Sequence, residues 1–161
     1  MGKKTALPMF GVGPLYVAVV IGLTAAAFFC RNLPVFASGR ADRLRIPLGI
    51  AGGLLIICGI VLWIQAVLIA KIDDGIREGE LVTHGVYAWV RNPIYSAFMI
   101  ACTGVILLIG NLYFLILPFV FWGFMTVLMK HTEEKWLRRI FGQPYDEYCK
   151  KVNRCIPWRR R

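Results

Sequence analysis

Three long uncharged runs dominate the sequence and constrain its fold more than any other feature. Residues 5–30 and 46–70 hold 26 and 25 residues without a charge, and residues 92–129 hold 38. An α-helix rises about 1.5 Å per residue, so about 20 residues cross a hydrocarbon core about 30 Å thick. The first two runs each predict one crossing, and the third is nearly twice as long as one crossing needs. The chain is therefore expected to be an integral membrane protein.

The third run is broken near its middle by Gly110-Asn111, which predicts a tight helical hairpin. Its arms are short, so a long tilted helix with a re-entrant arm is the alternative. The first run is too long for a cleaved signal peptide and is expected to stay in the protein. We predict an all-α integral membrane fold in one domain, residues 1–161, with about four transmembrane helices. The expected spans are about 8–30, 46–70, 94–109 and 112–129.

The charges lie outside the apolar runs and indicate the topology. The formal net charge of +10 could suggest a nucleic-acid partner, but its placement favours the membrane surface instead. Four crossings place the amino terminus, the 71–91 loop and the carboxyl tail on one side, with fifteen of the nineteen Lys and Arg residues. That side is predicted to be cytosolic. The far side carries the other four: Arg31, Arg40, Arg43 and Arg45.

Two polar segments flank the hairpin on the predicted cytosolic side. The first ends at Asn92-Pro93, where Asn is a typical N-cap and Pro a typical first residue of a helix. The second, residues 130–152, carries apolar residues at helical spacing and predicts two amphipathic interfacial helices that break at Gly142. Taken alone, Glu133 and Glu134 are acidic residues in a first helical turn. Arg154 and Arg159–Arg161 are expected to anchor the tail to anionic lipid.

Small residues and cysteines give weaker signals. Gly49-x-x-x-Gly53 is a motif that lets helices approach closely, either within one chain or between two copies, so an oligomer is possible. The five cysteines form no C-x-x-C pair, and we expect neither a disulfide nor a metal site.

The two polar segments together resemble the isoprenylcysteine carboxyl methyltransferase family, which is grouped with phospholipid methyltransferases. Residues 81–95, Leu-Val-Thr-His-Gly-Val-Tyr-Ala-Trp-Val-Arg-Asn-Pro-Ile-Tyr, are similar to the family pattern L-V-T-x-G-x-Y-x-x-x-R-H-P-x-Y. The likeness continues at residues 133–148, Glu-Glu-x-x-Leu-x-x-x-Phe-Gly-x-x-Tyr-x-x-Tyr, and ends near Pro157. It covers about half the chain.

The resemblance implies that S-adenosylmethionine binds between segments 79–95 and 130–157. Glu133 can accept hydrogen bonds from the cofactor, and Arg91 can meet an anionic group of cofactor or substrate. The implied cofactor-binding residues are Leu81, Val82, His84, Gly85, Tyr87, Asn92, Pro93, Tyr95 and Glu133. The implied catalytic residues are Arg91, Glu133 and Glu134. One departure is Asn92, where the family usually has His; the amide cannot carry a charge, and His84 is the candidate to compensate.

The implied activity is methylation of a lipophilic substrate that enters from the bilayer. A carboxylate nucleophile, as in an isoprenylcysteine, needs no general base, and this reading is favoured. A phospholipid amine would need deprotonation, for which Glu134 or a histidine is the candidate. Further alternatives are an NADPH-dependent reductase, because sterol reductases carry a similar Arg-His-Pro-x-Tyr, and a non-catalytic relative.

Overall fold

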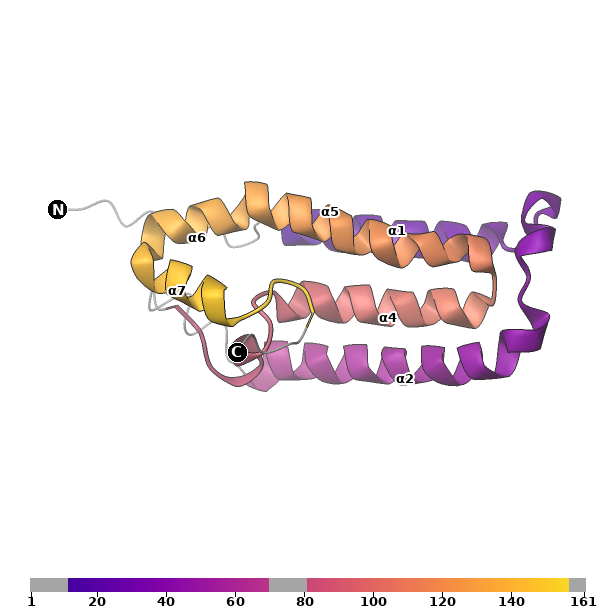
Figure 1. Ribbon diagram of the computed structural model, residues 1–161, viewed down its shortest axis with the longest axis horizontal. Coiled ribbons are helices and arrows are strands. Elements are labelled where there is room, and N and C mark those ends of the chain that lie inside the picture. Colours follow the sequence, from indigo (N-terminus) through magenta and orange to yellow (C-terminus); the bar gives the residue numbers. More distant parts are fainter. Residues whose placement is uncertain (1–11, 70–80, 157–161) are drawn as a thin grey trace.

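Helices make up the secondary structure of the computed structural model, apart from two isolated bridges in its described residues, 12–69 and 81–156 (Figure 1). In chain order they are α1 (Gly13–Cys30), η1 (Pro34–Gly39), η2 (Asp42–Leu44), α2 (Arg45–Ile64), η3 (Gln65–Ile69), η4 (Gly85–Ala88), α4 (Pro93–Ile109), η5 (Leu112–Ile116), α5 (Leu117–His131), α6 (Glu133–Phe141) and α7 (Gln143–Lys151). Residues 1–11, 70–80 and 157–161 lie outside the described part of the chain, and with them the amino terminus, most of the predicted 71–91 loop and the predicted lipid anchor Arg159–Arg161.

Four long helices, α1, α2, α4 and α5, run side by side along the long axis of the molecule (Figure 1). Within the described residues, three segments are long and apolar enough to cross a membrane: Gly13–Cys30, Asp42–Leu68 and Leu112–Phe141. The fourth, α4, is shorter at 17 residues. The chain is thus an all-α integral membrane protein, as predicted.

The hairpin in the third apolar run is confirmed, with a turn at the predicted dipeptide. Gly110 ends α4 with φ 66°, a left-handed conformation that favours glycine. Asn111 then accepts a hydrogen bond from the backbone N–H of Tyr113 and starts η5. The second arm was expected to be α-helical from Leu112, but its first five residues form a 3₁₀ turn before α5 begins.

Glycines join α2 to α4, but they are not the two of the sequence motif. A Cβ on Gly52 would lie 2.6 Å from the carbonyl oxygen of Gly104, and one on Gly104 would lie 2.5 Å from that of Gly52. A Cβ on Gly49 or Gly53 would meet nothing within 4 Å. The prediction for the Gly49-x-x-x-Gly53 motif is therefore wrong within this chain, because the rotation of α2 turns Gly52 toward α4.

A buried core connects α1 to the hairpin. The phenol of Tyr16 is fully buried and donates a hydrogen bond to the carbonyl of Phe121, 3.4 Å away in α5. The ring of Tyr16 also lies edge-on to that of Tyr95, at the start of α4. Fully or almost fully buried side chains fill the interior: Val20, Ile106, Phe121, Met125 and Met129.

The two amphipathic helices break where the sequence predicts. Gly142, with φ 58°, separates α6 from α7. Tyr145, Tyr148 and Val152 are buried, whereas Ile140, expected on the apolar face, is 38% exposed. These helices lie at the same end of the bundle as the start of α1 and the segment before α4, and η1 and η2 lie at the opposite end (Figure 1). The predicted grouping of the segments by side agrees with this arrangement.

Candidate functional site

The segment before α4 and the carboxyl-terminal segment pair through their backbones. Val90 and Asn153 form a parallel bridge, and the N–H of Arg91 donates to the carbonyl of Asn153 at 2.8 Å. The hydroxyl of Tyr148 donates to the carbonyl of Tyr87. Val90 and Val152 are buried beside this pairing. The two segments that carry the family resemblance therefore form one structural unit, although the hairpin separates them in sequence.

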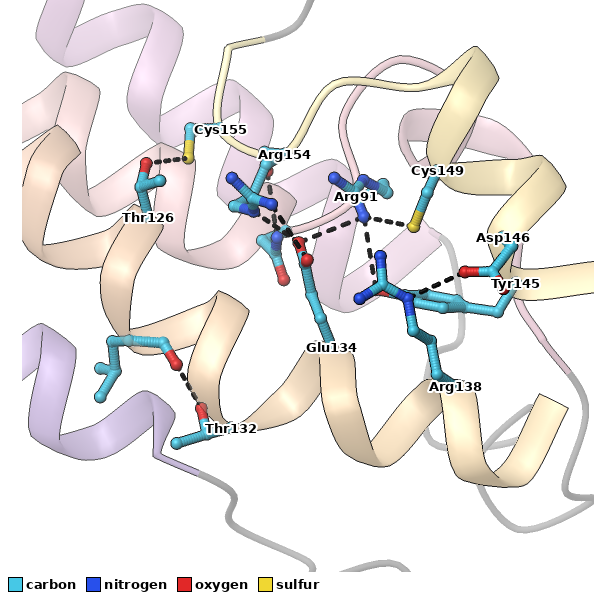
Figure 2. Close-up of polar contacts among 12 residues, drawn as sticks. Arg91, Thr126, Thr132, Glu134, Arg138, Tyr145, Asp146, Cys149, Arg154 and Cys155 are labelled. Atoms are coloured by element: carbon cyan, nitrogen blue, oxygen red, sulfur yellow. Dashed lines mark hydrogen bonds and ion pairs between the residues drawn. The ribbon is translucent and has the colours of Figure 1, made fainter. Parts of the chain in front are cut away.

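Glu134 is the centre of this unit (Figure 2). Its Oε1 lies 3.2 Å from Nη1 of Arg91, and Arg154 donates to both carboxylate oxygens, from Nε at 2.5 Å and from Nη2 at 3.0 Å. The side chains of Glu134 and Arg91 are only 2% and 8% exposed. Such buried charges are tolerated only when they are paired. The hydrogen bond to Glu134 also raises the pKa of the Arg154 guanidinium.

Arg91 has further partners on α7. Its Nη1 donates to the hydroxyl of Tyr145 at 3.5 Å and contacts Sγ of Cys149. Burial raises the pKa of both Tyr145 and Tyr148 above the usual range for tyrosine, so their hydroxyls stay protonated. Among the described residues, the buried Nε of Arg91 has no hydrogen-bond partner. One donor of this guanidinium therefore has unused bonding capacity.

A second pair, formed by Tyr95 and Glu133, lies where α1, α4 and α6 meet. The hydroxyl of Tyr95 donates to Oε1 of Glu133 at 2.9 Å. Gly13 lies against the Tyr95 ring so closely that a Cβ there would overlap its hydroxyl. The adjacent Ser96 is fully buried, and its hydroxyl has no partner among the described residues. Each half of the Glu133-Glu134 dipeptide thus has its own partner from the 91–95 segment.

Asn92 differs from its predicted role. It occupies the N-cap position of α4, but its side chain makes no capping hydrogen bond. Its Nδ2 instead donates to the carbonyl of Arg154 at 3.1 Å. Asn92 thus occupies the predicted N-cap position, but its side chain does not cap the helix, because its amide donates to the carbonyl of Arg154 in the carboxyl-terminal segment. Asn92 therefore ties the carboxyl-terminal segment to the start of α4.

The remaining predicted residues surround these pairs at different depths. Leu81 packs against the buried cluster of Tyr145, Tyr148 and Val152, and Val82 is half-buried. Tyr87 and Pro93 are buried, whereas His84 is exposed. Gly85 has φ 60° with open space around its Cα, so backbone conformation is what favours glycine there.

Three residues at the centre were absent from the predicted site: Tyr145, Cys149 and Arg154. Tyr145 and Cys149 belong to the apolar stripe of α7, so the pattern indicated burial but not their partner. Arg154 was expected to anchor the tail to lipid, and this is wrong because its guanidinium binds Glu134. The family pattern ends close to Arg154, which is the signal that could have included it.

The sequence is similar to a known protein family and to several known proteins. Residues 48–144 match the family model described as phospholipid methyltransferase. The chain is 42% identical to the protein-S-isoprenylcysteine O-methyltransferase of Schizosaccharomyces pombe over 82 residues. The aligned region is 50% of this chain and 34% of that protein. It is 32% identical over 140 residues to the protein of the same name from Saccharomyces cerevisiae, 82% of this chain and 57% of the relative.

The chain is also 38% identical over 82 residues to a probable protein-S-isoprenylcysteine O-methyltransferase of Oryza sativa subsp. japonica, 50% of this chain and 42% of the relative. It spans between 34% and 57% of the length of these three relatives. No solved structure gives a significant match to the chain.

Proposed function

Because the chain belongs to the phospholipid methyltransferase family, we propose that it is a membrane methyltransferase that uses S-adenosylmethionine. Its proposed substrate is the carboxylate of a lipophilic, isoprenylcysteine-like compound, the substrate class that the names of its relatives indicate. The proposed site is the end of the bundle where Arg91, Tyr95, Glu133 and Glu134 lie. By the charge distribution of the sequence, this end faces the cytosol.

The donors and acceptors at this end suit a cofactor that has hydroxyl, amino and carboxylate groups. Glu133 is an acceptor for hydroxyl or amino groups, and Tyr95 already orients its carboxylate. The buried hydroxyl of Ser96 and the Nε of Arg91 have bonding capacity that the described protein atoms leave unused. Leu81, Val82, Gly85 and Tyr87 supply backbone and ring surface. When bound, S-adenosylmethionine supplies an electrophilic methyl group, and its transfer to a carboxylate cancels two opposite charges without moving a proton.

The surroundings of Glu134 favour a carboxylate substrate over an amine. An amine must lose a proton before it can accept a methyl group, so the protein would need a general base. Glu134 is the buried acid nearest to Arg91, but two guanidinium groups bind its carboxylate and make it a weak proton acceptor. Its role is instead to hold Arg91 and Arg154 in place. This pairing removes Glu134 as a candidate base and is the single observation in the structure that favours O-methylation.

The residues of the site would therefore act by binding and positioning. Arg91 and Arg154 fix the loop and the tail on either side of Glu134, and the buried tyrosines of α7 exclude water. Exclusion of water and close alignment are the main contributions that a reaction between opposite charges needs. A lipophilic tail would extend from this end into the bilayer along the exposed apolar faces of the helices.

A phospholipid amine N-methyltransferase is the second candidate. It is favoured by the description of the family model, which covers residues 48–144. The two candidates share the cofactor and differ in the acceptor.

Cofactor binding and methyl transfer together test the proposal. Calorimetry on the detergent-purified chain should give binding of S-adenosylmethionine and S-adenosylhomocysteine but not of NADPH. Glu133→Ala should weaken binding about tenfold or more, as expected for loss of a charge-assisted hydrogen bond. Glu147→Ala, on the exposed side of α7, is the matched control and should bind as the wild type does.

Labelled S-adenosylmethionine then identifies the acceptor. N-acetyl-S-farnesylcysteine should be methylated, and phosphatidylethanolamine vesicles should not. Methylation of the amine lipid alone would support the second candidate. Binding of NADPH in place of the adenosyl compounds would refute both, and no binding unless Asn92 is changed to His would indicate a non-catalytic relative.

A further inference from the structure

A cavity of about 390 Å³ lies at the end of the bundle opposite the proposed site. It is bounded by the end of α1, the segment that carries η1 and η2, the start of α2 and the end of α4. These elements meet at the far end of the molecule from α6 and α7 (Figure 1). Its volume is within the usual range for a small-molecule site.

The wall of this cavity is fixed by hydrogen bonds between distant segments. The N–H of Ala41 donates to the carbonyl of Gly110 at 2.8 Å, and Arg40 forms an isolated bridge with Asn111. The side chain of Asn111, 3% exposed, also donates to the carbonyl of Phe36 at 2.8 Å. The η1–η2 segment is thus tied to the hairpin turn. The cavity is part of the fold and does not depend on one surface loop.

The polar side of the cavity is cationic. Arg31, Arg40 and Arg45 line it, with Asp42 as the one acidic residue of the lining. Arg31 is held in place by Phe28. Its guanidinium donates to the carbonyl of Phe28, and its Cζ lies 3.7 Å from the centre of the Phe28 ring. Within residues 12–69 and 81–156, none of these three arginines forms an ion pair. Their positive charge is therefore available to a ligand.

The same cavity also has an apolar side. Phe28 of α1 and Val105, Leu108 and Ile109 of α4 form it. Leu108 is 51% exposed, so this side opens to the surface that the bilayer covers. A ligand that fits both sides has an anionic head beside the arginines and a hydrocarbon part beside α4. That combination describes an anionic lipid better than a free anion.

We propose that this cavity binds the phosphate-bearing headgroup of an anionic phospholipid in the leaflet opposite the methyltransferase site. Arginine is well suited to phosphate, because its guanidinium presents several N–H donors in one plane. The start of α2 at Arg45 adds the positive end of a 20-residue helix to the cavity lining. A bound phosphate also explains how three of the four arginines on the side that the charge bias makes non-cytosolic are accommodated. The proposal does not depend on the activity at the other end.

Thermal unfolding of the full-length chain in detergent tests this site. The midpoint is measured against equal concentrations of palmitoyl-oleoyl phosphatidylglycerol, palmitoyl-oleoyl phosphatidylcholine and sodium phosphate. A ligand that binds only the folded state raises the midpoint, and the stabilisation grows with the logarithm of one plus the ratio of the free ligand concentration to Kd. Phosphatidylglycerol should raise the wild-type midpoint, and the other two should have little effect.

Variants locate the effect. The side chain of Arg45 is exposed and forms no hydrogen bond or ion pair within the described residues, so Arg45→Gln should fold normally and weaken the apparent affinity for phosphatidylglycerol about five- to tenfold. The triple variant Arg31→Gln, Arg40→Gln, Arg45→Gln should lose the effect almost completely. Arg43→Gln is the matched control, since Arg43 is close in sequence but does not line the cavity, and it should respond as the wild type does.

Three results would overturn the proposal. An equal response of Arg45→Gln and Arg43→Gln to phosphatidylglycerol would show that the lipid binds elsewhere, for example at the basic tail. An equal effect of phosphatidylcholine would show that the arginines do not select the headgroup charge. An equal effect of sodium phosphate would assign the cavity to a free anion.

Discussion

The two ends of the bundle both concentrate arginine, yet they use it in different ways. At the end formed by α6 and α7, Arg91 and Arg154 bind one buried carboxylate, that of Glu134. At the opposite end, Arg31, Arg40 and Arg45 line a cavity, and none of them forms an ion pair within the described residues. In the first arrangement the charges of the arginines are balanced by a carboxylate of the chain itself, whereas in the second they are not.

Burial explains the difference. The Arg91 side chain is 8% exposed, so it would lose most of its hydration on folding without a partner, and Glu134 supplies the compensating charge. Arg40 and Arg45 are exposed and keep their hydration. A charge that the fold buries must be paired within the chain, whereas a charge at an open cavity can be paired by a molecule from outside.

The largest expected effect is on the paired end. Glu134→Ala leaves Arg91 buried without its anion and should lower the free energy of unfolding by about 3–5 kcal/mol. Thermal and denaturant unfolding in detergent measure this change. At the other end, Arg45→Gln should change the free energy of unfolding by no more than about 0.5 kcal/mol when lipid is absent. Similar losses in both variants would contradict the comparison.

The next effect concerns the α2–α4 contact on which both ends depend. Gly104→Ala places a methyl group 2.5 Å from the carbonyl oxygen of Gly52, which forces the helices apart and should cost about 1–3 kcal/mol. Gly53→Ala, with open space around its Cα, is the control and should be neutral or slightly stabilising. Unfolding midpoints of the two variants, measured side by side, decide this. Loss of stability in Gly53→Ala alone would instead favour a contact between two copies of the chain.

An effect of similar size is expected at the hydrogen bond between Tyr95 and Glu133. Tyr95→Phe removes the hydroxyl that donates to Glu133 but keeps the ring beside Tyr16. Because this hydrogen bond involves a charged acceptor, its loss should cost about 1.5–3 kcal/mol if the pair is desolvated, and less to the extent that water replaces it. Cofactor affinity should fall in the same variant, since Glu133 loses its orientation. Unchanged stability together with unchanged cofactor affinity would exclude Tyr95 from the site.

The smallest effect is expected for an exposed ion pair at the same end of the bundle as the buried one. Arg138 and Asp146 form an ion pair on α6 and α7 with N–O separation 2.8 Å, but their side chains are 46% and 52% exposed. Arg138→Ala should cost at most about 1 kcal/mol, and the cost should shrink in high salt. Unfolding at low and high ionic strength measures both. A loss as large as that of Glu134→Ala would mean that position in the bundle, and not burial, sets the strength of these pairs.

Local features of the chain were predictable from sequence. The breaks at Gly110 and Gly142 were located correctly, because both positions require a positive φ that glycine adopts at little cost. The family resemblance also selected Arg91, Tyr95, Glu133 and Glu134, which the structure brings together in two pairs. It could not tell which acid meets which partner, because that depends on how α6 rotates against α4.

The sequence by itself determined that this protein is a helical membrane bundle and which of its ends carries the family motifs. Hydropathy and charge act locally, so their pattern along the chain is enough for those conclusions. Only the tertiary structure decided that Arg154 binds Glu134, that Gly52 and Gly104 form the close contact, and that three arginines surround a cavity. Each of these depends on the rotation and approach of segments that lie 20 or more residues apart in the chain, and a linear pattern does not specify them.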